Sequence, residues 1–265
     1  MGHLVDGRRV LRVRVDGAKE GPDQVAVEEP LTVRIDGATV ATTMRTPGHD
    51  LDLALGWLVS EGVVRQPADV IDAVACDADT VDVRLAPGIA PPPARIGATS
   101  SACGICGSDS IAEVLARRGP AAPAGRPTLT SAVLAALPET LRAAQRAFDR
   151  SGGLHAAGLF TPDGHLVCIR EDVGRHNAVD KVVGWALREG LLPAHEYVLH
   201  VSGRASFELT QKAAMAGIPV LAAVSAPSTL AVDLARDAGL TLAGFVRDNA
   251  FNLYAGSERV LLSPR

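Results

Sequence analysis

From residue 154 onward, short apolar runs alternate with longer runs whose apolar residues recur at helical spacing. The spacing predicts helices over 177–188, 206–216 and 228–238, and the short runs predict strands over 155–160, 165–170, 197–201, 220–224 and 241–246. Strands that alternate with helices predict an α/β domain whose sheet is at least partly parallel. Such sheets bind ligands outside the carboxyl ends of their strands, and polar, glycine-containing segments follow several strands here.

The first hundred residues have a different pattern, with shorter elements. Alternating residues at 31–35 and 38–43 flank Asp36-Gly37, which is the strongest short signal for a β-hairpin. A helical pattern over 51–60 follows the capping candidates of Thr46-Pro-Gly-His-Asp50. Two further short strands are predicted over 70–75 and 81–85. These elements predict a small mixed α/β lobe.

Composition divides the chain into four segments. We predict a frayed N-terminal tail over 1–20, because it is polar and contains glycine. The small N-terminal lobe then covers 21–98, and a mobile Cys-containing loop and linker covers 99–128, between Pro-rich stretches at 86–98 and 119–127. The α/β domain occupies 129–265, and an Ala/Leu-rich helix over 129–150 begins it.

The overall composition is typical of a globular protein, with 47% hydrophobic and 21% charged residues. The net charge of −4 argues against nucleic acid or an anionic membrane as a partner. No apolar run reaches the roughly 18 residues that a membrane span requires. Because the N-terminus also lacks the apolar region of a secretory signal, we expect a cytoplasmic protein.

The segment with the clearest chemistry is Ser100-Ser-Ala-Cys103-Gly-Ile-Cys106-Gly-Ser-Asp109. Two cysteines at this spacing can form half of a zinc site, cycle between dithiol and disulfide, or carry sulfane sulfur. They can also be incidental thiols in a turn. The isolated Cys76 and Cys168 lie in apolar surroundings and are expected to be buried, so they do not complete a zinc site.

Polar turns follow the predicted strands and suit an anionic ligand. The segments that begin at Arg170, Ser202 and Ser225 each place hydroxyls or cationic side chains before a helix, where backbone N–H groups favour phosphate. The alternative for these residues is a salt-bridged helix start or a plain N-cap. In Phe245-Val-Arg-Asp-Asn-Ala250, Arg247 and Asn249 could contact a base or a phosphate.

Taken together, these blocks resemble the FdhD/NarQ family of formate dehydrogenase accessory sulfurtransferases. The resemblance covers most of the chain, and the order of the blocks makes it specific. Its blocks are Gly56-Trp-Leu-Val-Ser-Glu-Gly62, Cys103-Gly-Ile-Cys-Gly107, Glu171-Asp-Val-Gly-Arg-His176, Ser202-Gly-Arg-Ala-Ser206, Ser225-Ala-Pro-Ser-Thr229 and Phe245-Val-Arg247.

The resemblance implies a fold, an activity and partners. It implies a C-terminal domain similar to cytidine deaminases, a small N-terminal lobe and a homodimer. Members of the family accept sulfur from a cysteine desulfurase and sulfurate the Mo-bis(molybdopterin guanine dinucleotide) cofactor for formate dehydrogenase, and a guanine nucleotide such as GDP would mimic that cofactor. By motif, Cys103 would carry the persulfide, with Cys106 as its partner, and residues 245–250 would contact the guanine nucleotide. The expected cofactor-binding set is Phe245, Val246, Arg247, Asp248, Asn249, Ala250, Arg175, His176, Ser202, Arg204, Ser225, Ser228 and Thr229.

Other functions receive less support from the sequence. Deamination requires H-x-E with a later P-C-x-x-C, but His155-Ala-Ala157 lacks the glutamate and the cysteine pair lies upstream of it. A molybdenum-cofactor binding chaperone without sulfur transfer is the main alternative, because it would keep the strand-end turns and need neither thiol. A dithiol oxidoreductase is the third function that the sequence allows.

Overall fold

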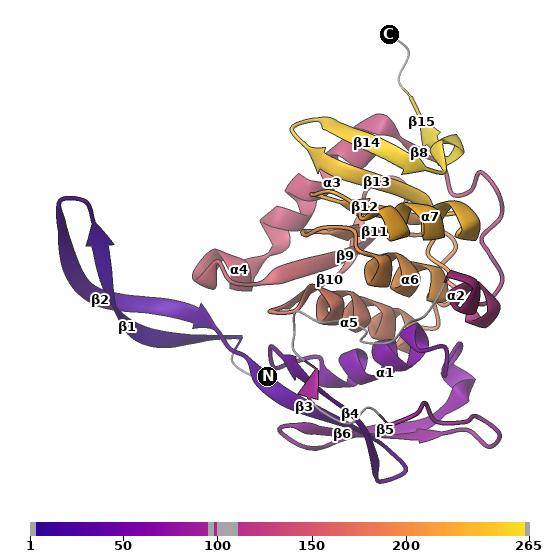
Figure 1. The fold of residues 1–265 in the computed structure, drawn as a ribbon, viewed down its shortest axis with the longest axis horizontal. Coiled ribbons are helices and arrows are strands. Elements are labelled where there is room, and N and C mark those ends of the chain that lie inside the picture. Colours follow the sequence, from indigo (N-terminus) through magenta and orange to yellow (C-terminus); the bar gives the residue numbers. More distant parts are fainter. Residues whose placement is uncertain (1–3, 95–97, 100–110, 263–265) are drawn as a thin grey trace.

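Two sheets joined by a pair of packed helices form the body of the molecule (Figure 1). The computed structural model describes residues 4–94, 98–99 and 111–262. Within these residues, no helix is both long and apolar enough to cross a membrane.

The C-terminal sheet has six strands in the order β10-β9-β11-β12-β13-β14. Strands β11, β12 and β13 run parallel to one another, and the outer pairs are antiparallel. The predicted α/β architecture with a partly parallel sheet is therefore confirmed. The bounds are β9 His155–Phe160, β10 Leu166–Asp172, β11 Val198–Val201, β12 Val220–Ala223, β13 Thr241–Arg247 and β14 Ala250–Ala255.

Helices cover both faces of this sheet (Figure 1). Side chains alternate between the faces of a strand, so Leu199 and Val201 enter one core, with helix α5, whereas Val198 packs with Leu134 of helix α3 on the opposite face. Helices α5, α6 and α7 lie on the first face, and α3 lies on the second. The bounds are α2 Ile111–Arg117, α3 Ser131–Ala144, α4 Arg146–Ser151, α5 Arg175–Arg188, α6 Phe207–Met215 and α7 Thr229–Ala238.

The helix predicted over 129–150 is divided in the structure. Thr130 caps α3, because its hydroxyl accepts a hydrogen bond from the Val133 amide at 3.2 Å. Gln145, with φ −79° and ψ 71°, leaves the helical region and separates α3 from α4. Two short strands, β8 Leu129–Thr130 and β15 Val260–Leu261, pair in parallel beside this helix.

The N-terminal sheet has the order β5-β6-β3-β4-β7 and confirms the predicted hairpin. Asp36 and Gly37 both have positive φ, 50° and 81°, as a two-residue hairpin turn of the primed type requires. The bounds are β3 Glu29–Ile35, β4 Ala38–Arg45, α1 Asp50–Ser60, the short helix η1 Pro67–Asp69, β5 Val70–Asp77, β6 Thr80–Leu85 and β7 Ala98–Thr99.

Helix α1 joins this sheet to the C-terminal domain by packing against α5. The close approach depends on two glycines, because a Cβ added to Gly56 would lie 1.8 Å from the Asp180 carbonyl oxygen, and one added to Gly184 would lie 1.8 Å from that of Asp52. One hydrophobic core runs through the contact, from Leu31 of β3 to Leu242 of β13. The two parts therefore share their main core.

The first residues form an arm that the sequence did not predict. Strands β1 (Val5–Arg14) and β2 (Gly17–Ala26) pair over their full length and project from the body, where a frayed tail over 1–20 was expected (Figure 1). The base of the arm packs on the body through Val5, which is buried with Ala147 and Leu154. The prediction of a frayed tail was wrong for the residues within this hairpin.

Candidate functional site

The expected site segments meet at one edge of the C-terminal sheet. The parallel strands β11, β12 and β13 all end at this edge, and the antiparallel strand β9 begins there with His155. Strand β10 also ends there, where Asp172 pairs with His155. The carboxyl ends of parallel strands are the usual ligand-binding edge of such a sheet.

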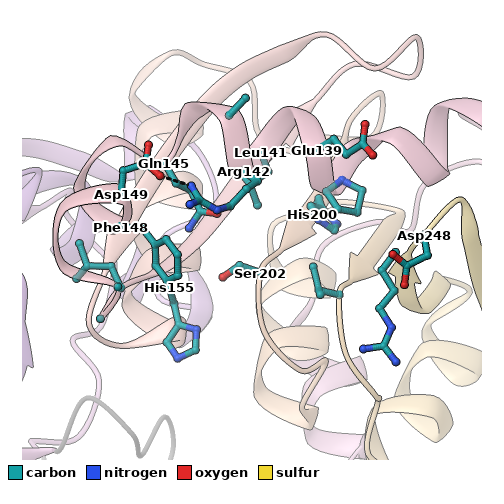
Figure 2. Close-up of a pocket in the computed structure, with 17 residues that line it drawn as sticks. Glu139, Leu141, Arg142, Gln145, Phe148, Asp149, His155, His200, Ser202 and Asp248 are labelled. Atoms are coloured by element: carbon teal, nitrogen blue, oxygen red, sulfur yellow. Dashed lines mark hydrogen bonds and ion pairs between the residues drawn. The ribbon is translucent and has the colours of Figure 1, made fainter. Parts of the chain in front are cut away.

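A cavity of about 980 Å³ opens on the α3 and α4 side of this edge (Figure 2). Figure 2 shows Ser202 and His200 beneath α3, with Asp248 of the β13–β14 turn on one side and His155 on the other. Polar side chains that line it include Glu139, Arg142, His155, His200, Ser202 and Arg247. The cavity is therefore built by the strand ends together with α3 and α4.

His200 is the most unusual group in this cavity. It is fully buried, and neither ring nitrogen has a hydrogen-bond partner of normal geometry among the described residues. Burial lowers its pKa to about 3, although the backbone of Ala222 opposes this slightly. The ring is therefore neutral near pH 7, with one N–H donor and one nitrogen acceptor. Both ring nitrogens are covered in this structure, so a ligand reaches them only when the side chains above them move. An unpaired buried polar group costs about 1–3 kcal/mol, which a ligand would recover.

Ser202 and His155 are held at the sheet edge by the backbone of β9. The Ser202 hydroxyl accepts from the Ala156 amide at 2.9 Å, and the Ser202 amide donates to the Ala156 carbonyl at 3.0 Å. Burial, and then the charge of Arg175, lowers the pKa of His155. An added Cβ on Gly203 would lie 3.5 Å from His155 Nδ1 and 3.8 Å from Arg175 Cδ, so this glycine fits between the two side chains.

Residues with positive φ occur near the end of β13 and in the turn between β13 and β14. Phe245, Asp248 and Asn249 all have positive φ, between 53° and 56°. Asp248 and Asn249 are the two central residues of a hairpin turn of the primed type, where positive φ is usual for Asp and Asn. Phe245 lies in β13, and positive φ at a bulky residue is a genuine outlier. The Phe245 amide donates to the Ser225 carbonyl at 3.2 Å, which joins β13 to the segment after β12. The Arg247 guanidinium carbon lies 5.7 Å from the centroid of the Phe245 ring.

The expected residues of this turn have different environments. Arg247 and Asp248 line the cavity. Val246 is fully buried in the hydrophobic core on the α3 side, so its side chain is a packing residue. Asn249 and Ala250 are exposed on the turn and are not among the cavity-lining residues.

The remaining expected residues lie at the starts of α5, α6 and α7, at the same sheet edge. His176 is buried, its Nε2 lies 3.9 Å from Glu208 Oε2, and burial lowers its pKa. The Ser228 hydroxyl accepts from the Ala231 amide at 3.3 Å, which is the plain N-cap considered above. Arg175 and Ser225 are partly buried, and Arg204 and Thr229 are exposed. The expected set is thus divided between the cavity, with Ser202, Arg247 and Asp248, and the helix starts.

The cysteines have separate positions. Cys103 and Cys106, which the sequence predicts to be the reactive pair, lie outside the described residues. Cys168 is buried as expected, and burial raises the pKa of its thiol to about 12. Cys76 on β5 is exposed, so the expectation that it is buried was wrong. Strand β5 lies at the edge of its sheet, and all of its residues except Val70 and Ala73 are exposed.

Sequence reasoning missed His155 and His200 as cavity residues. A signal for His200 was available, because it is a polar residue inside the buried run Val198–Val201. The contributions of Glu139 and Arg142 had no such signal, since both lie on the exposed side of an ordinary amphipathic helix.

The comparisons with known proteins show the family of this chain. A family model described as the FdhD/NarQ family matches residues 26–261. The chain belongs to the FdhD/NarQ family. It is 53% identical over 275 residues to the sulfur carrier protein FdhD of Streptomyces coelicolor, covering 99% of this chain and 98% of that protein. It is 48% identical over 276 residues to the protein of the same name from Mycobacterium tuberculosis, covering 98% and 100%.

A solved structure shows the same fold. The protein is from Desulfotalea psychrophila and carries the description of a formate dehydrogenase accessory protein. The match has a TM-score of 0.80 and covers 98% of this chain and 100% of that one. At 23% identity, this likeness shows the fold alone.

Proposed function

We propose that this chain is a sulfur carrier that holds sulfur as a persulfide on Cys103 and delivers it to the Mo-bis(molybdopterin guanine dinucleotide) cofactor of formate dehydrogenase. The observation that carries the proposal is the glycine-framed pair Cys103 and Cys106 in a chain of the FdhD/NarQ family, whose relatives are named sulfur carriers. The thiol of Cys168 is a poor alternative, because a buried thiol with a pKa near 12 is protonated.

The proposed chemistry has two steps. The Cys103 thiolate attacks the terminal sulfur of a persulfide on a cysteine desulfurase, the S–S bond of that persulfide breaks, and the desulfurase thiolate leaves. Cys106 then either attacks the inner sulfur of the Cys103 persulfide or supports its neighbour without reacting. In the first case hydrosulfide leaves towards the metal and a Cys103–Cys106 disulfide forms, which an external thiol reductant must reduce before the next cycle.

The cavity supports the cofactor part of the proposal. Its volume of about 980 Å³ is at the upper end of the roughly 300–1,000 Å³ of small-molecule sites. Arg247 at its rim provides a cation for a phosphate, and neutral His200 provides a donor and an acceptor for a heterocyclic base. Arg175, near His155, adds a second cation at the sheet edge. We therefore assign the guanine nucleotide of the substrate to this cavity.

The proposed partners are a cysteine desulfurase as sulfur donor, formate dehydrogenase as the protein that receives the cofactor, and a second copy of the chain in a homodimer. A cofactor-binding chaperone without sulfur transfer would use the same cavity. It would need neither Cys103 nor Cys106, so the first experiment below separates the two functions.

The first test measures sulfur on the protein directly. After incubation with a cysteine desulfurase and cysteine, the peptide that contains Cys103 should gain about 32 Da per sulfur atom in mass spectrometry. We expect Cys103→Ala to lose this gain and the matched control Cys76→Ala to keep it. A wild-type chain that binds guanine nucleotide but never gains sulfur, or a gain located on Cys76, would contradict the proposal.

The second test measures nucleotide binding by titration calorimetry with GDP and with inorganic diphosphate. Replacing Arg247 by alanine should weaken both ligands about 10- to 100-fold, because a charge-assisted hydrogen bond contributes about 1.5–3 kcal/mol. His200→Phe should weaken GDP but leave diphosphate nearly unchanged, because His200 is assigned to the base. Arg236→Ala, at an exposed position of α7, is the matched control and should bind as the wild type does. Equal GDP affinity in all three variants would show that the nucleotide does not bind in this cavity.

A further inference from the structure

The arm formed by β1 and β2 has almost no support from the rest of the chain. Its base is anchored by the buried Val5 and by a hydrogen bond from Arg150 Nε to Gln24 Oε1 at 2.7 Å. Beyond the base, the two strands continue into solvent (Figure 1). An isolated two-stranded hairpin is at best marginally stable in water. Strands of ten residues that project in this way therefore require a surface on which to pack.

The outer half of the arm has one apolar face and one basic face. Leu11 and Val13 point to the same side and are 60% and 72% exposed, and Val15 at the turn is fully exposed. Their cross-strand partners on that face are Glu20 and Ala18. The opposite face carries Arg12, Arg14 and Lys19, with Lys19 directly across from Arg12. Arg12 is paired with Asp23 at 3.4 Å, so the excess positive charge near the tip comes from Arg14 and Lys19. A partner for this arm must offer apolar contacts together with negative charge.

The chain itself has such a surface at the base of the same arm. A groove of about 910 Å³ runs between the arm and the N-terminal sheet, and Val25, Ala26 and Val27 form its apolar part. Its carboxylates are Asp6, Glu28, Glu29, Asp50 and Asp77. Arg8 lines the groove and Arg45 pairs with Glu29 and Asp50, so part of this charge is neutralised and a negative excess is left.

We propose that two copies of this chain exchange arms, so that the tip of each arm occupies the acidic groove of the other copy. A twofold axis through the middle of the arm, near Val10 and its partner Gly21, brings the tip of one arm to the base of the other. Leu11 and Val13 then pack against the partner's arm, and Val15 reaches the apolar wall of the partner's groove. The basic side chains near the tip meet the groove carboxylates. The contact is self-complementary, as a twofold interface must be.

This arrangement accounts for features that a single chain leaves unexplained. It covers the exposed apolar side chains in the outer half of the arm, Leu11, Val13 and Val15. It also predicts that the dimer weakens as salt concentration rises, because the charges at the arm tip and at the groove rim are exposed and screened at about 8–10 Å in physiological salt. The proposal is independent of sulfur transfer, since neither Cys103 nor Cys106 takes part.

Sedimentation equilibrium of the full chain tests the exchange. We expect a dimer whose dissociation constant rises at least about 100-fold when residues 8–23 are replaced by an Asn-Gly turn, because the central contacts of an interface carry most of its affinity. A wild-type chain that remains monomeric at all concentrations would overturn the proposal. So would a dimer of unchanged affinity after the arm is shortened, although the homodimer itself would then survive.

Charge reversal identifies the surface that each arm meets. The arm variant Arg14→Glu/Lys19→Glu and the groove variant Glu28→Lys/Asp77→Lys should each dimerise at least about tenfold more weakly than the wild type, because like charges would then face each other. Mixing the two variants should restore a heterodimer of near wild-type affinity. Failure to recover in the mixture, with both variants folded by circular dichroism, would show that the tip does not enter this groove.

Discussion

Gly56→Ala should unfold at a clearly lower urea concentration than the wild type, with a loss of at least about 3 kcal/mol in the free energy of unfolding. The sign is the informative part, because alanine at a helix position otherwise stabilises by up to about 1 kcal/mol over glycine. Here the new Cβ would lie 1.8 Å from the Asp180 carbonyl oxygen and 2.8 Å from the Gly184 amide nitrogen. Both are backbone atoms of α5, so α1 and α5 must move apart.

Separation of these two helices would also disturb the polar contacts around them. Asp52 of α1 forms ion pairs with Arg170 at 2.9 Å and with Arg188 at 2.7 Å, and the Ser60 hydroxyl donates to Asp180 at 2.7 Å. Gly119→Ala is the matched control, since an added Cβ there meets nothing within 4 Å. Equal urea midpoints for Gly56→Ala and Gly119→Ala would contradict the close helix contact.

Local patterns were sufficient to predict most of the elements. The Asp36-Gly37 turn, the helix at Asp50–Ser60 and the alternation of strands and helices after residue 154 all depend on neighbours in sequence. The local sequence determines these elements directly, either through turn residues that favour positive φ or through the spacing of apolar residues. The strand-end location of the site followed from the same pattern, because parallel strands place their carboxyl ends together.

The remaining features depend on contacts between distant residues. The packing of Gly56 against α5 could not be read from the sequence, since a glycine inside a helical pattern usually indicates only a weaker helix. The arm was missed because its strands contain charges and glycines and bury little, although Leu11, Val13 and Val15 alternate as in a strand. The burial of His200 depends on how α3 covers the sheet, and α3 lies about sixty residues before His200 in sequence.

Lys181 belongs to the segment that begins at Arg170, for which the sequence allows either an anionic ligand or a salt-bridged helix start. Its side chain is fully buried, and Nζ lies 2.7 Å from both Asp172 Oδ2 and the Thr46 carbonyl oxygen. Asp172, also fully buried, accepts further hydrogen bonds from the Thr46 amide at 3.1 Å, the Gly174 amide at 2.8 Å and Asn177 Nδ2 at 3.1 Å. Lys181 is therefore a supporting residue that joins the start of α5 to the N-terminal part.

Lys181→Met should lower the free energy of unfolding by about 3–5 kcal/mol, because it leaves the Asp172 carboxylate buried without a counter-charge. Asp172→Asn should have a similar effect by leaving the Lys181 ammonium unpaired. The double variant Asp172→Asn/Lys181→Met should be less destabilised than the sum of the single variants, since no unpaired charge is left in it. Urea denaturation of the four chains measures this coupling, and strict additivity would rule out a direct buried pair.

An exposed ion pair provides the matched control. Arg84 and Asp72 lie 3.8 Å apart with both side chains more than half exposed, so Arg84→Met should change stability by no more than about 1 kcal/mol.

The buried pair of Lys181 and Asp172 also has a functional consequence, because Arg175 and His176 follow directly after the turn that Asp172 holds. A Lys181→Met chain that is still folded should therefore bind GDP more weakly, although Lys181 itself never reaches the cavity. If GDP affinity stayed unchanged while stability fell, the start of α5 would not contribute to the nucleotide site.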